Sequence, residues 1–547
     1  MKSIKVRLLL VFTLLIGVMA FISPSDRFFS IARNLDIFAS VFKEVDKYYV
    51  DETDPNQLIE VAIDSMLASL DPYTNYIPQE DAESFKTFTT GEYAGIGAQI
   101  TIIDSSVYIS MLYPGFAAQK AGLKIGDQLL SMDDTGFAHK TVSQVSTILK
   151  GKSKTSAILK VKRTGVNDTL SFNIQREKIS IKNVPYYGMV DNSNVGYIRL
   201  DDFTTGAGKE VQSAVKELIS SGAKSIILDL RDNPGGLLNE AINVANVFIP
   251  KNKLVVFTKG KVKEWNRSYK TLNNPVDNDI PLAVLVNEES ASASEIVAGV
   301  IQDYDRGILI GNRTFGKGLV QSTRPLSYNT QLKVTTAKYY IPSGRCIQAL
   351  DYSHRDENGN VNQIPDSLYH KFKTKGGRQV FDGGGLFPDI EVAGESLAPI
   401  SVDLLTKGLI FIYANKYFVE NGALDNWHLK KGEYQNFLMW LDERGFTYKS
   451  TMQSEIESLI TSAKDENYYD RMKKEINELQ KELSKHNYDE IHRYQPQIIR
   501  LLEQGIAMHM QLEAGAIIYL TKNDRTIKTA IGKLNNNGDY KQILTRK

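Results

Sequence analysis

The stretch LAVLVNEESASASEIVAGVI, residues 282–301, says most about the fold of this chain. Its first five residues are apolar and typical of a buried strand, and its last six are typical of a helix. Between them lies a cluster of small residues, Ser290 to Glu295. This order predicts a strand-to-helix turn, where a hydroxyl group lies beside free backbone N–H groups and the positive end of a helix dipole. Such a turn suits a nucleophile whose attack creates an oxyanion.

The same serines have a second interpretation. Serine is a favoured N-cap residue, and Glu295 can complete a capping box with Ser292. From this turn alone, capping is the simpler hypothesis. A serine nucleophile also needs a base, and none of the seven histidines flanks a strand end in this part of the chain.

Lysine can act as the base when burial removes its charge, because desolvation lowers the pKa of an ammonium group. Lys317 is the candidate, since it follows the apolar run Ile308 to Ile310 and a Thr-Phe-Gly sequence. Four residues later, Gln321 falls on the same side of an expected strand, where its amide can hold the amine. Out of context, Lys317 is more simply a solvated loop lysine, and Gln321 can equally be a surface glutamine.

The segment DLRDNPGG, residues 229–236, ends another buried apolar run. Its paired glycines allow backbone N–H groups to point at a ligand. The segment can therefore supply an oxyanion donor, or it can be a tight turn before a helix.

Together these segments resemble the carboxyl-terminal processing peptidases, also called tail-specific proteases. The shared patterns are Asn287-x-x-Ser290-Ala-Ser292-Ala-Ser294-Glu295-Ile296, Thr314-Phe-Gly-Lys317-Gly-x-Val-Gln321 and Asp229-Leu-Arg-x-Asn-x-Gly235-Gly236. The resemblance implies a multidomain α+β fold. Its parts are a crotonase-like α/β peptidase core, an inserted PDZ domain and helical regions at both ends.

The resemblance also implies roles for the residues of the site. Ser292 is expected to be the nucleophile, Lys317 the general base and Gln321 the residue that orients the lysine. Ser290 and Ser294 are then expected to serve packing and capping at the start of the helix.

The oxyanion hole implied by the resemblance uses the N–H groups of Ala293 and of Gly235 or Gly236. Chemistry of this kind needs no metal and no organic cofactor, so we expect none. We expect Asp303 to be structural and Cys346 to be a small buried side chain, since nothing near Cys346 in sequence lowers the pKa of a thiol.

Short β-branched runs separated by glycines fill residues 88–178 and predict a compact β-rich module. The resemblance implies that this module is a PDZ domain, with Gly95, Ile96, Gly97 and Ala98 as its carboxylate-binding loop. Successive N–H groups of a glycine loop bind anions, and a neighbouring strand can receive an extended peptide. We therefore expect the partners to be proteins or peptides with free, unstructured C-termini. Relatives usually have larger apolar residues where this chain has Ala98-Gln99.

Changes of pattern divide the chain into five parts. They are a signal peptide or membrane anchor (1–25), an N-terminal helical region (26–87), the PDZ domain (88–178), the peptidase core (179–395) and a C-terminal helical region (396–547). The last part is charge-rich, with an apolar stripe from Met472 to Leu483 at helical spacing. This stripe is compatible with plain packing, with partner binding and with a homo-oligomer.

The N-terminus predicts export. Lys2, Lys5 and Arg7 precede an apolar run from Leu8 to Ile22, which is short for an ordinary membrane-spanning helix. We expect a periplasmic or otherwise extracytoplasmic protein whose segment 8–22 is either removed or kept as an anchor in the inner membrane. Because 65 basic residues nearly balance 64 acidic ones, no binding to nucleic acid is expected.

The resemblance to the carboxyl-terminal processing peptidases implies a serine endopeptidase that binds the C-terminal tail of a protein and cleaves upstream through an acyl-enzyme. Two alternatives remain. One is a non-catalytic adaptor in which the PDZ domain binds peptides, and the other is an acyl-CoA enzyme, because the expected core resembles the crotonase fold.

Overall fold

The computed structural model describes residues 25–356, 359–424 and 426–545. The expected signal or anchor segment, residues 8–22, lies outside the described residues. The chain divides into two compact units, residues 1–76 with 323–334 and residues 77–322 with 335–547, which are described one by one. No described helix is both long and apolar enough to cross a membrane.

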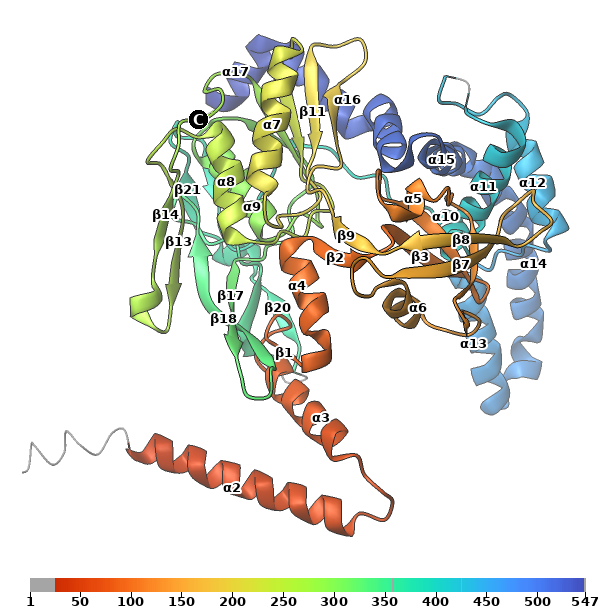
Figure 1. Cartoon of the computed structure of the whole chain (residues 1–547), viewed down its shortest axis with the longest axis horizontal. Coiled ribbons are helices and arrows are strands. Elements are labelled where there is room, and N and C mark those ends of the chain that lie inside the picture. The colour runs from red at the N-terminus through yellow and green to blue at the C-terminus, as the bar shows by residue number, and fades with distance from the viewer. Residues whose placement is uncertain (1–24, 357–358, 425, 546–547) are drawn as a thin grey trace, which may run out of the picture. The chain divides into compact units, whose positions relative to one another are not determined.

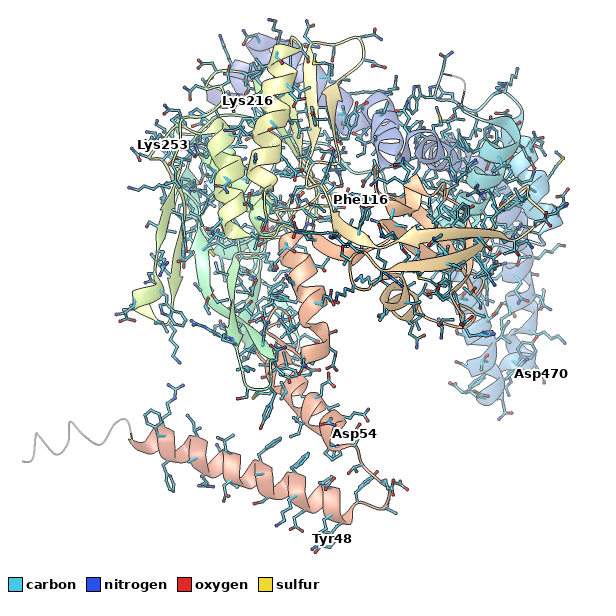
Figure 2. The ribbon with its side chains drawn as sticks, viewed as in Figure 1. Tyr48, Asp54, Phe116, Lys216, Lys253 and Asp470 are labelled. Carbon is cyan, nitrogen blue, oxygen red and sulfur yellow. The ribbon has the colours of Figure 1, made fainter. Side chains whose placement is uncertain are left out.

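The first unit contains two helices, α2 (Ser25–Tyr48) and α3 (Pro55–Ala68), so the helical character expected near the N-terminus is confirmed. Helix α3 begins after Asp54, whose carboxylate accepts a backbone N–H group of the first turn. Figure 2 marks the end of α2 with Tyr48 and the cap of α3 with Asp54. The apolar side chains of α2 are largely exposed.

In the second unit, a β-rich module follows helix α4 (Ala82–Thr90) (Figure 1). Its main sheet has the strand order β3-β4-β5-β7-β8, and all of these neighbours are antiparallel. The strands are β3 (Ala98–Ile103), β4 (Ser106–Leu112), β5 (Gln128–Met132), β7 (Ser156–Lys162) and β8 (Leu170–Gln175). Helix α6 (Val142–Leu149) contributes Val145 and Leu149 to the core of the module. Strand β2 (Glu92–Gly95) pairs with β9 (Glu177–Ser180) at the ends of the module.

The expected peptidase core is built on a six-stranded sheet with the order β10-β11-β12-β15-β16-β23. Its neighbours are parallel except for β10 and β11. The strands are β10 (Tyr186–Met189), β11 (Val195–Arg199), β12 (Ser225–Asp229), β15 (Leu282–Val286), β16 (Ile308–Gly311) and β23 (Ile390–Glu391). All residues of β12 and β15 are buried, so both faces of the sheet are covered, as is usual for parallel sheets.

Two layers of helices cover the sheet. Helices α7 (Ala207–Ser220), α8 (Leu238–Phe248) and α9 (Ala293–Asp303) pack on one face. The other face packs against the end of the C-terminal region, α16 (Arg525–Asn535) and α17 (Asn537–Thr545). The two faces alternate along β12, because Ile226 belongs to the first cluster and Ile227 to the second. The C-terminal region therefore completes the core of the sheet, which its charge-rich sequence does not indicate.

A second sheet lies beside this core. In it β18 pairs with β13, β13 with β14, and β17 with β18. The strands are β13 (Leu254–Gly260), β14 (Ser268–Lys270), β17 (Leu319–Pro325) and β18 (Gln331–Tyr340). Further along the chain, two short hairpins form. They are β19 (Leu350–Arg355) with β20 (Val361–Gln363), and β21 (Lys371–Lys373) with β22 (Gln379–Phe381).

The remaining C-terminal helices are α10 (Pro399–Thr406), α11 (Leu409–Asn421), α12 (Glu433–Glu443), α13 (Thr451–Asp465), α14 (Tyr469–Arg493) and α15 (Gln495–Asn523). The expected apolar stripe lies on α14, where Ile476 is buried but Met472 and Leu479 are exposed. Helix α11 contacts the β-rich module, since Asn415 Nδ2 donates to Thr164 Oγ1 at 2.9 Å.

Candidate active site

Ser292 lies at the turn between β15 and α9, as the sequence predicts. Its backbone has φ +56° and ψ −111°, a conformation that few residues other than glycine adopt. Strained backbone of this kind is frequent at functional sites, where the surrounding contacts hold it. The turn places Ser292 at the N-terminal end of α9, which favours negative charge.

The Glu295 carboxylate joins the backbone of Ser292 to that of Lys317. Its Oε2 accepts the N–H of Ser292 at 2.9 Å and the N–H of Lys317 at 2.8 Å. Its Oε1 accepts the N–H of Gly316 at 2.8 Å and the hydroxyl of Thr314 at 2.6 Å. Burial raises the pKa of Glu295 to about 7, although the four hydrogen-bond donors lower it. The capping interpretation therefore explains only one of the four hydrogen bonds of Glu295, the one from the N–H of Ser292.

Tyr339 joins the same two residues through their carbonyl groups. Its hydroxyl oxygen lies 2.6 Å from the carbonyl oxygen of Lys317 and 3.1 Å from that of Ser292. A hydroxyl has one hydrogen, so Tyr339 donates to one carbonyl at a time. The side chain is buried on β18. Ser292 and Lys317 are therefore held together at both their N–H and their C=O groups.

The loop after β12 passes close to Ser292. A Cβ atom added to Gly235 would lie 2.9 Å from Ser292 Cβ and 2.7 Å from the nitrogen of Ala293. Gly235 also has φ +98°, so both space and backbone conformation require glycine here. Its own N–H donates to Asn233 Oδ1 at 2.9 Å, which makes Gly236 the better candidate for an oxyanion donor beside Ala293. The role of these N–H groups stays a prediction.

Buried serines attach this loop to the turn. Ser290 Oγ donates to the carbonyl of Leu230 at 2.8 Å, and Ser294 Oγ donates to the carbonyl of Asn233 at 2.9 Å. The same Asn233 carbonyl accepts the N–H of Ala291 at 3.0 Å. The expectation that Ser290 and Ser294 serve packing and capping of the helix is therefore incomplete, because their hydroxyls fix the neighbouring loop.

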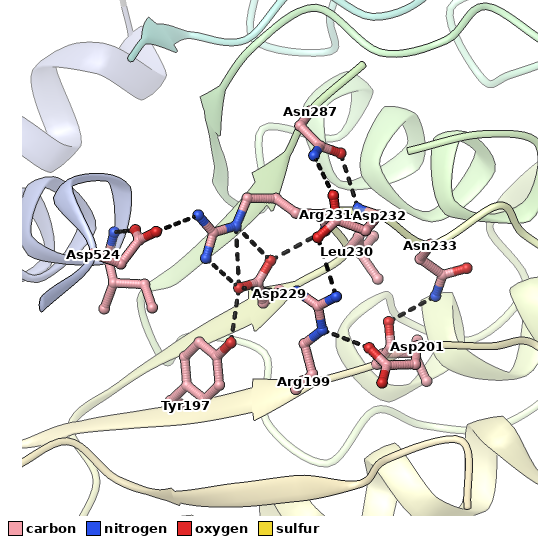
Figure 3. A network of polar contacts seen from close by, with 12 residues as sticks. Tyr197, Arg199, Asp201, Asp229, Leu230, Arg231, Asp232, Asn233, Asn287 and Asp524 are labelled. Carbon is pink, nitrogen blue, oxygen red and sulfur yellow. Dashed lines mark hydrogen bonds and ion pairs between the residues drawn. The ribbon is translucent and has the colours of Figure 1, made fainter. Parts of the chain in front are cut away.

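Asp229 ends β12 in a buried network of charges (Figure 3). It accepts hydrogen bonds from Arg231 Nη2 at 2.7 Å and from the Tyr197 hydroxyl at 2.8 Å, and Arg199 Nη1 lies 3.7 Å away. Burial raises the pKa of Asp229, but the two arginines outweigh burial and bring it to about 2. Arg231 also reaches the C-terminal region, where its Nη1 lies 2.9 Å from Asp524 Oδ2.

Two other residues singled out in the sequence have defined contacts. Gln321 lies on β17 and its Nε2 donates to Thr335 Oγ1 at 3.2 Å, while its expected action on Lys317 stays a prediction. Asp303 accepts a hydrogen bond from Arg345 Nη2 at 2.9 Å, and both side chains are almost fully buried. This ion pair agrees with the structural role expected for Asp303.

Cys346 is half-buried, and its burial raises the pKa of the thiol, so the thiol form is favoured. Across residues 25–356, 359–424 and 426–545, no group of three or more His, Cys, Asp or Glu side chains can hold a metal ion.

A groove of about 380 Å³ lies between β3 and α6 of the β-rich module. It is lined in part by Tyr93, Gly95, Ile96, Ala98, Ile100, Val142 and Leu149. Strand β3 is at the edge of its sheet, so one side of its backbone can pair with an added strand. Gly97 has φ +80° and packs against Phe116, which is marked in Figure 2. Three of the four residues expected to bind a peptide carboxylate therefore line the groove.

Sequence reasoning missed Tyr339, Asn233 and Asp524. Tyr339 is an inward-facing position on a strand, a pattern that indicates burial but not a bond to the Ser292 turn. Asn233 falls inside the quoted DLRDNPGG segment, where only the glycines were weighed. Nothing in the sequence links Asp524 to Arg231, which lies 293 residues earlier in the chain.

Comparison with known proteins agrees with this organisation. Four family models match the chain: Peptidase family S41 at residues 194–352, the PDZ domain at 86–162, the C-terminal helical domain of a probable PDZ-protease at 400–534, and the N-terminal domain of the activating protease CtpB at 23–81.

Several curated proteins are similar over more than half of the chain. The carboxy-terminal-processing protease of Bartonella bacilliformis is 36% identical over 322 residues, which are 58% of this chain and 73% of that protein. A probable CtpA-like serine protease of Staphylococcus aureus is 35% identical over 318 residues, 57% of this chain and 62% of that protein. A solved structure, the photosystem II D1 C-terminal processing protease, is 27% identical and covers 66% of this chain and 93% of its own, with a TM-score of 0.36.

The fold and these matches define a PDZ-containing serine endopeptidase. The chain belongs to peptidase family S41, the carboxyl-terminal processing proteases. The fold class expected from the sequence is confirmed, with a PDZ domain, a mixed α/β core and helices at both ends.

Proposed function

We propose that this peptidase binds the unstructured C-terminal tail of a protein substrate in its PDZ groove and cleaves the chain upstream through an acyl-enzyme. Ser292 is the nucleophile and Lys317 the general base. The observation that carries this proposal is the double attachment of Ser292 to Lys317. Glu295 binds both N–H groups, and the Tyr339 hydroxyl lies at both carbonyls.

In the acylation step, the uncharged amine of Lys317 takes the proton of the Ser292 hydroxyl as its oxygen attacks the scissile carbonyl. The N–H groups of Ala293 and Gly236 donate to the oxyanion of the tetrahedral intermediate. The protonated lysine then gives its proton to the leaving amine. Water attacks the acyl-enzyme by the same route, and Gln321 orients the lysine in both steps. No step needs a metal or an organic cofactor.

The PDZ groove supplies the substrate preference. A peptide that adds to the open edge of β3 places its C-terminal carboxylate at the loop Gly95 to Ala98 and its last side chain among the apolar residues of α6. The small side chain of Ala98 and the polar one of Gln99 leave that part of the groove less apolar than larger residues would.

For the location of the enzyme, we propose the periplasm or another extracytoplasmic compartment. The basic residues before the apolar segment 8–22 support export, and the segment itself is either an anchor or a removed signal.

The decisive experiment compares products by mass spectrometry. An unstructured substrate with a tagged C-terminus is incubated with the wild type, Ser292→Ala and Lys317→Ala. Ser213→Ala and Lys216→Ala, both exposed on α7, are the matched controls. We expect the controls to cleave like the wild type, whereas the two site variants bind the tail and lose cleavage at least about a thousandfold.

Full cleavage by Ser292→Ala would exclude this nucleophile. The non-catalytic adaptor would be favoured if the wild type bound the tail but did not cleave it and was not labelled by a serine-directed probe.

A further inference from the structure

The guanidinium of Arg231 is shared by two parts of the chain that are far apart in sequence. One side binds Asp229 at the end of β12, through Nε at 2.9 Å and Nη2 at 2.7 Å. The other side binds Asp524 Oδ2 through Nη1 at 2.9 Å. Charge-assisted hydrogen bonds of a planar guanidinium fix its orientation as well as its position.

Asp524 uses its two carboxylate oxygens for different purposes. Oδ1 accepts the N–H of Ile527 at 2.8 Å and so caps α16, whereas Oδ2 binds Arg231. The helix behind it is firmly packed, because Ile527 and Ala530 are fully buried against the strands of the core sheet. Asp524 therefore holds Arg231 from a rigid support (Figure 3).

Arg231 is also the second residue of the loop after β12, which approaches Ser292. The next residue, Asp232, has φ +61°, and its N–H and carboxylate are both bound by Asn287. Four residues after Arg231, Gly235 lies against Ser292 and Ala293. With so short a connection, a change in the backbone of Arg231 alters the position of the glycine N–H groups relative to the nucleophile.

We propose that Asp524 is a positioning residue of the peptidase site: by holding Arg231 it fixes the loop that carries the oxyanion-hole glycines. This gives the C-terminal helical region a part in the reaction besides covering the sheet. The proposal rests on the proposed function of Ser292 and its oxyanion hole.

The experiment uses the full chain and two substitutions that keep the helix cap. Asparagine and serine are both good N-cap residues, so Asp524→Asn and Asp524→Ser retain the bond to Ile527 but lose the charge that holds Arg231. The matched control is Asp539→Asn, which removes a carboxylate from a partly exposed ion pair with Lys533 in the same region. Active-site titration with a serine-directed probe counts the competent sites in each preparation.

We expect both Asp524 variants to lower kcat per titrated site about tenfold, with KM within about twofold of the wild type. Asp539→Asn should match the wild type in both constants. This split follows because an oxyanion hole acts on the transition state, while the PDZ groove that binds the tail is unchanged.

Two results would overturn the proposal. One is an unchanged kcat per titrated site in both Asp524 variants. The other is a loss of activity that equals the loss of titratable sites, including the case in which the variants do not fold. That result would assign Asp524 a purely structural role. The same titration shows separately whether the proposed function fails. In that case the serine-directed probe would not label the wild type, or it would still label Ser292→Ala.

Discussion

Two buried carboxylates near the site, Glu295 and Asp229, differ in the charge of their partners. Both side chains are fully buried. Asp229 is surrounded by Arg231 and Arg199, and its pKa falls to about 2. Glu295 has four uncharged donors, and burial raises its pKa to about 7.

The difference shows two ways to keep a carboxylate inside a protein. Opposite charges compensate the lost hydration of Asp229, so it stays ionised and anchors the loop after β12. Neutral donors compensate the lost hydration of Glu295 only in part, but each of them is a backbone or hydroxyl group of the segments around Ser292 and Lys317. Burial of Glu295 therefore costs some stability, but its carboxylate connects Ser292 directly to Lys317.

The largest effect on stability is expected when Asp229 loses its charge. In Asp229→Asn, Arg231 keeps Asp524 and Arg199 keeps Asp201, but both guanidinium groups lose the fully buried carboxylate that they share. We expect the free energy of unfolding to fall by about 4 kcal/mol. Chemical denaturation at pH 7 measures the change. The control Asp403→Asn, in an exposed pair with Lys407, should cost less than about 0.5 kcal/mol. Equal losses in the two variants would contradict the role given to the buried network.

The next effect is a pH dependence that separates the two carboxylates. The pKa of Glu295 is raised on folding, so its stabilisation is complete below the unfolded value of 4.5 and is lost as the pH rises through about 7. Between pH 5 and pH 8, the wild type should therefore lose about 3 kcal/mol relative to Glu295→Gln.

The Asp229→Asn variant gives the opposite expectation. The lowered pKa of Asp229 means that its stabilisation is present above the unfolded value of 3.8 and is lost only as the pH falls through about 2. Its stability difference from the wild type should hence be constant between pH 5 and pH 8. Denaturation curves across this range test both variants, and parallel pH profiles for them would contradict the comparison.

The smallest effect is expected at the hydroxyl that supports the Glu295 attachment. Tyr339→Phe removes the donor to the carbonyls of Lys317 and Ser292, which we expect to cost about 1 kcal/mol of stability and about tenfold in kcat. Its neighbour provides a close control, because the Tyr340 ring stacks on Phe257 with centroids 5.0 Å apart. Phenylalanine keeps that stacking, so Tyr340→Phe should behave like the wild type. An equal loss of kcat in both variants would remove the special role of Tyr339.

Much of the fold was accessible from local patterns. The apolar runs expected before the DLRDNPGG, Ser292 and Lys317 segments are found as β12, β15 and β16, and the helical run after Ser292 is found as α9. The β-rich pattern of residues 88–178 is found as strands that include β3, β4 and β7. These elements show either continuous apolar residues or helical spacing, and burial against a core requires such patterns. The stripe on α14 was less informative, since two of its members are exposed and only Ile476 is deeply buried.

The candidate site was predictable in its residues but not in its connections. Ser292 and Lys317 stood out because each lies in a dense local motif at the end of an element. The capping box pointed to one bond of Glu295, whereas its bonds to Gly316 and Lys317 come from another strand end. A single polar residue on a strand or helix forms no periodic pattern, so the sequence does not indicate which distant residue it contacts.

The order of apolar and small residues placed Ser292 and Lys317 at the ends of elements, because local sequence governs turns, caps and amphipathic faces. The class of enzyme and the roles of these residues followed from the resemblance of their motifs to a known family. Which residues meet across the core was settled by the packing of distant segments. Asp524 reaches Arg231, and Tyr339 reaches Ser292 and Lys317, because the folded sheets and helices bring them together. Burial then makes those contacts strong, since water no longer competes for the same donors and acceptors.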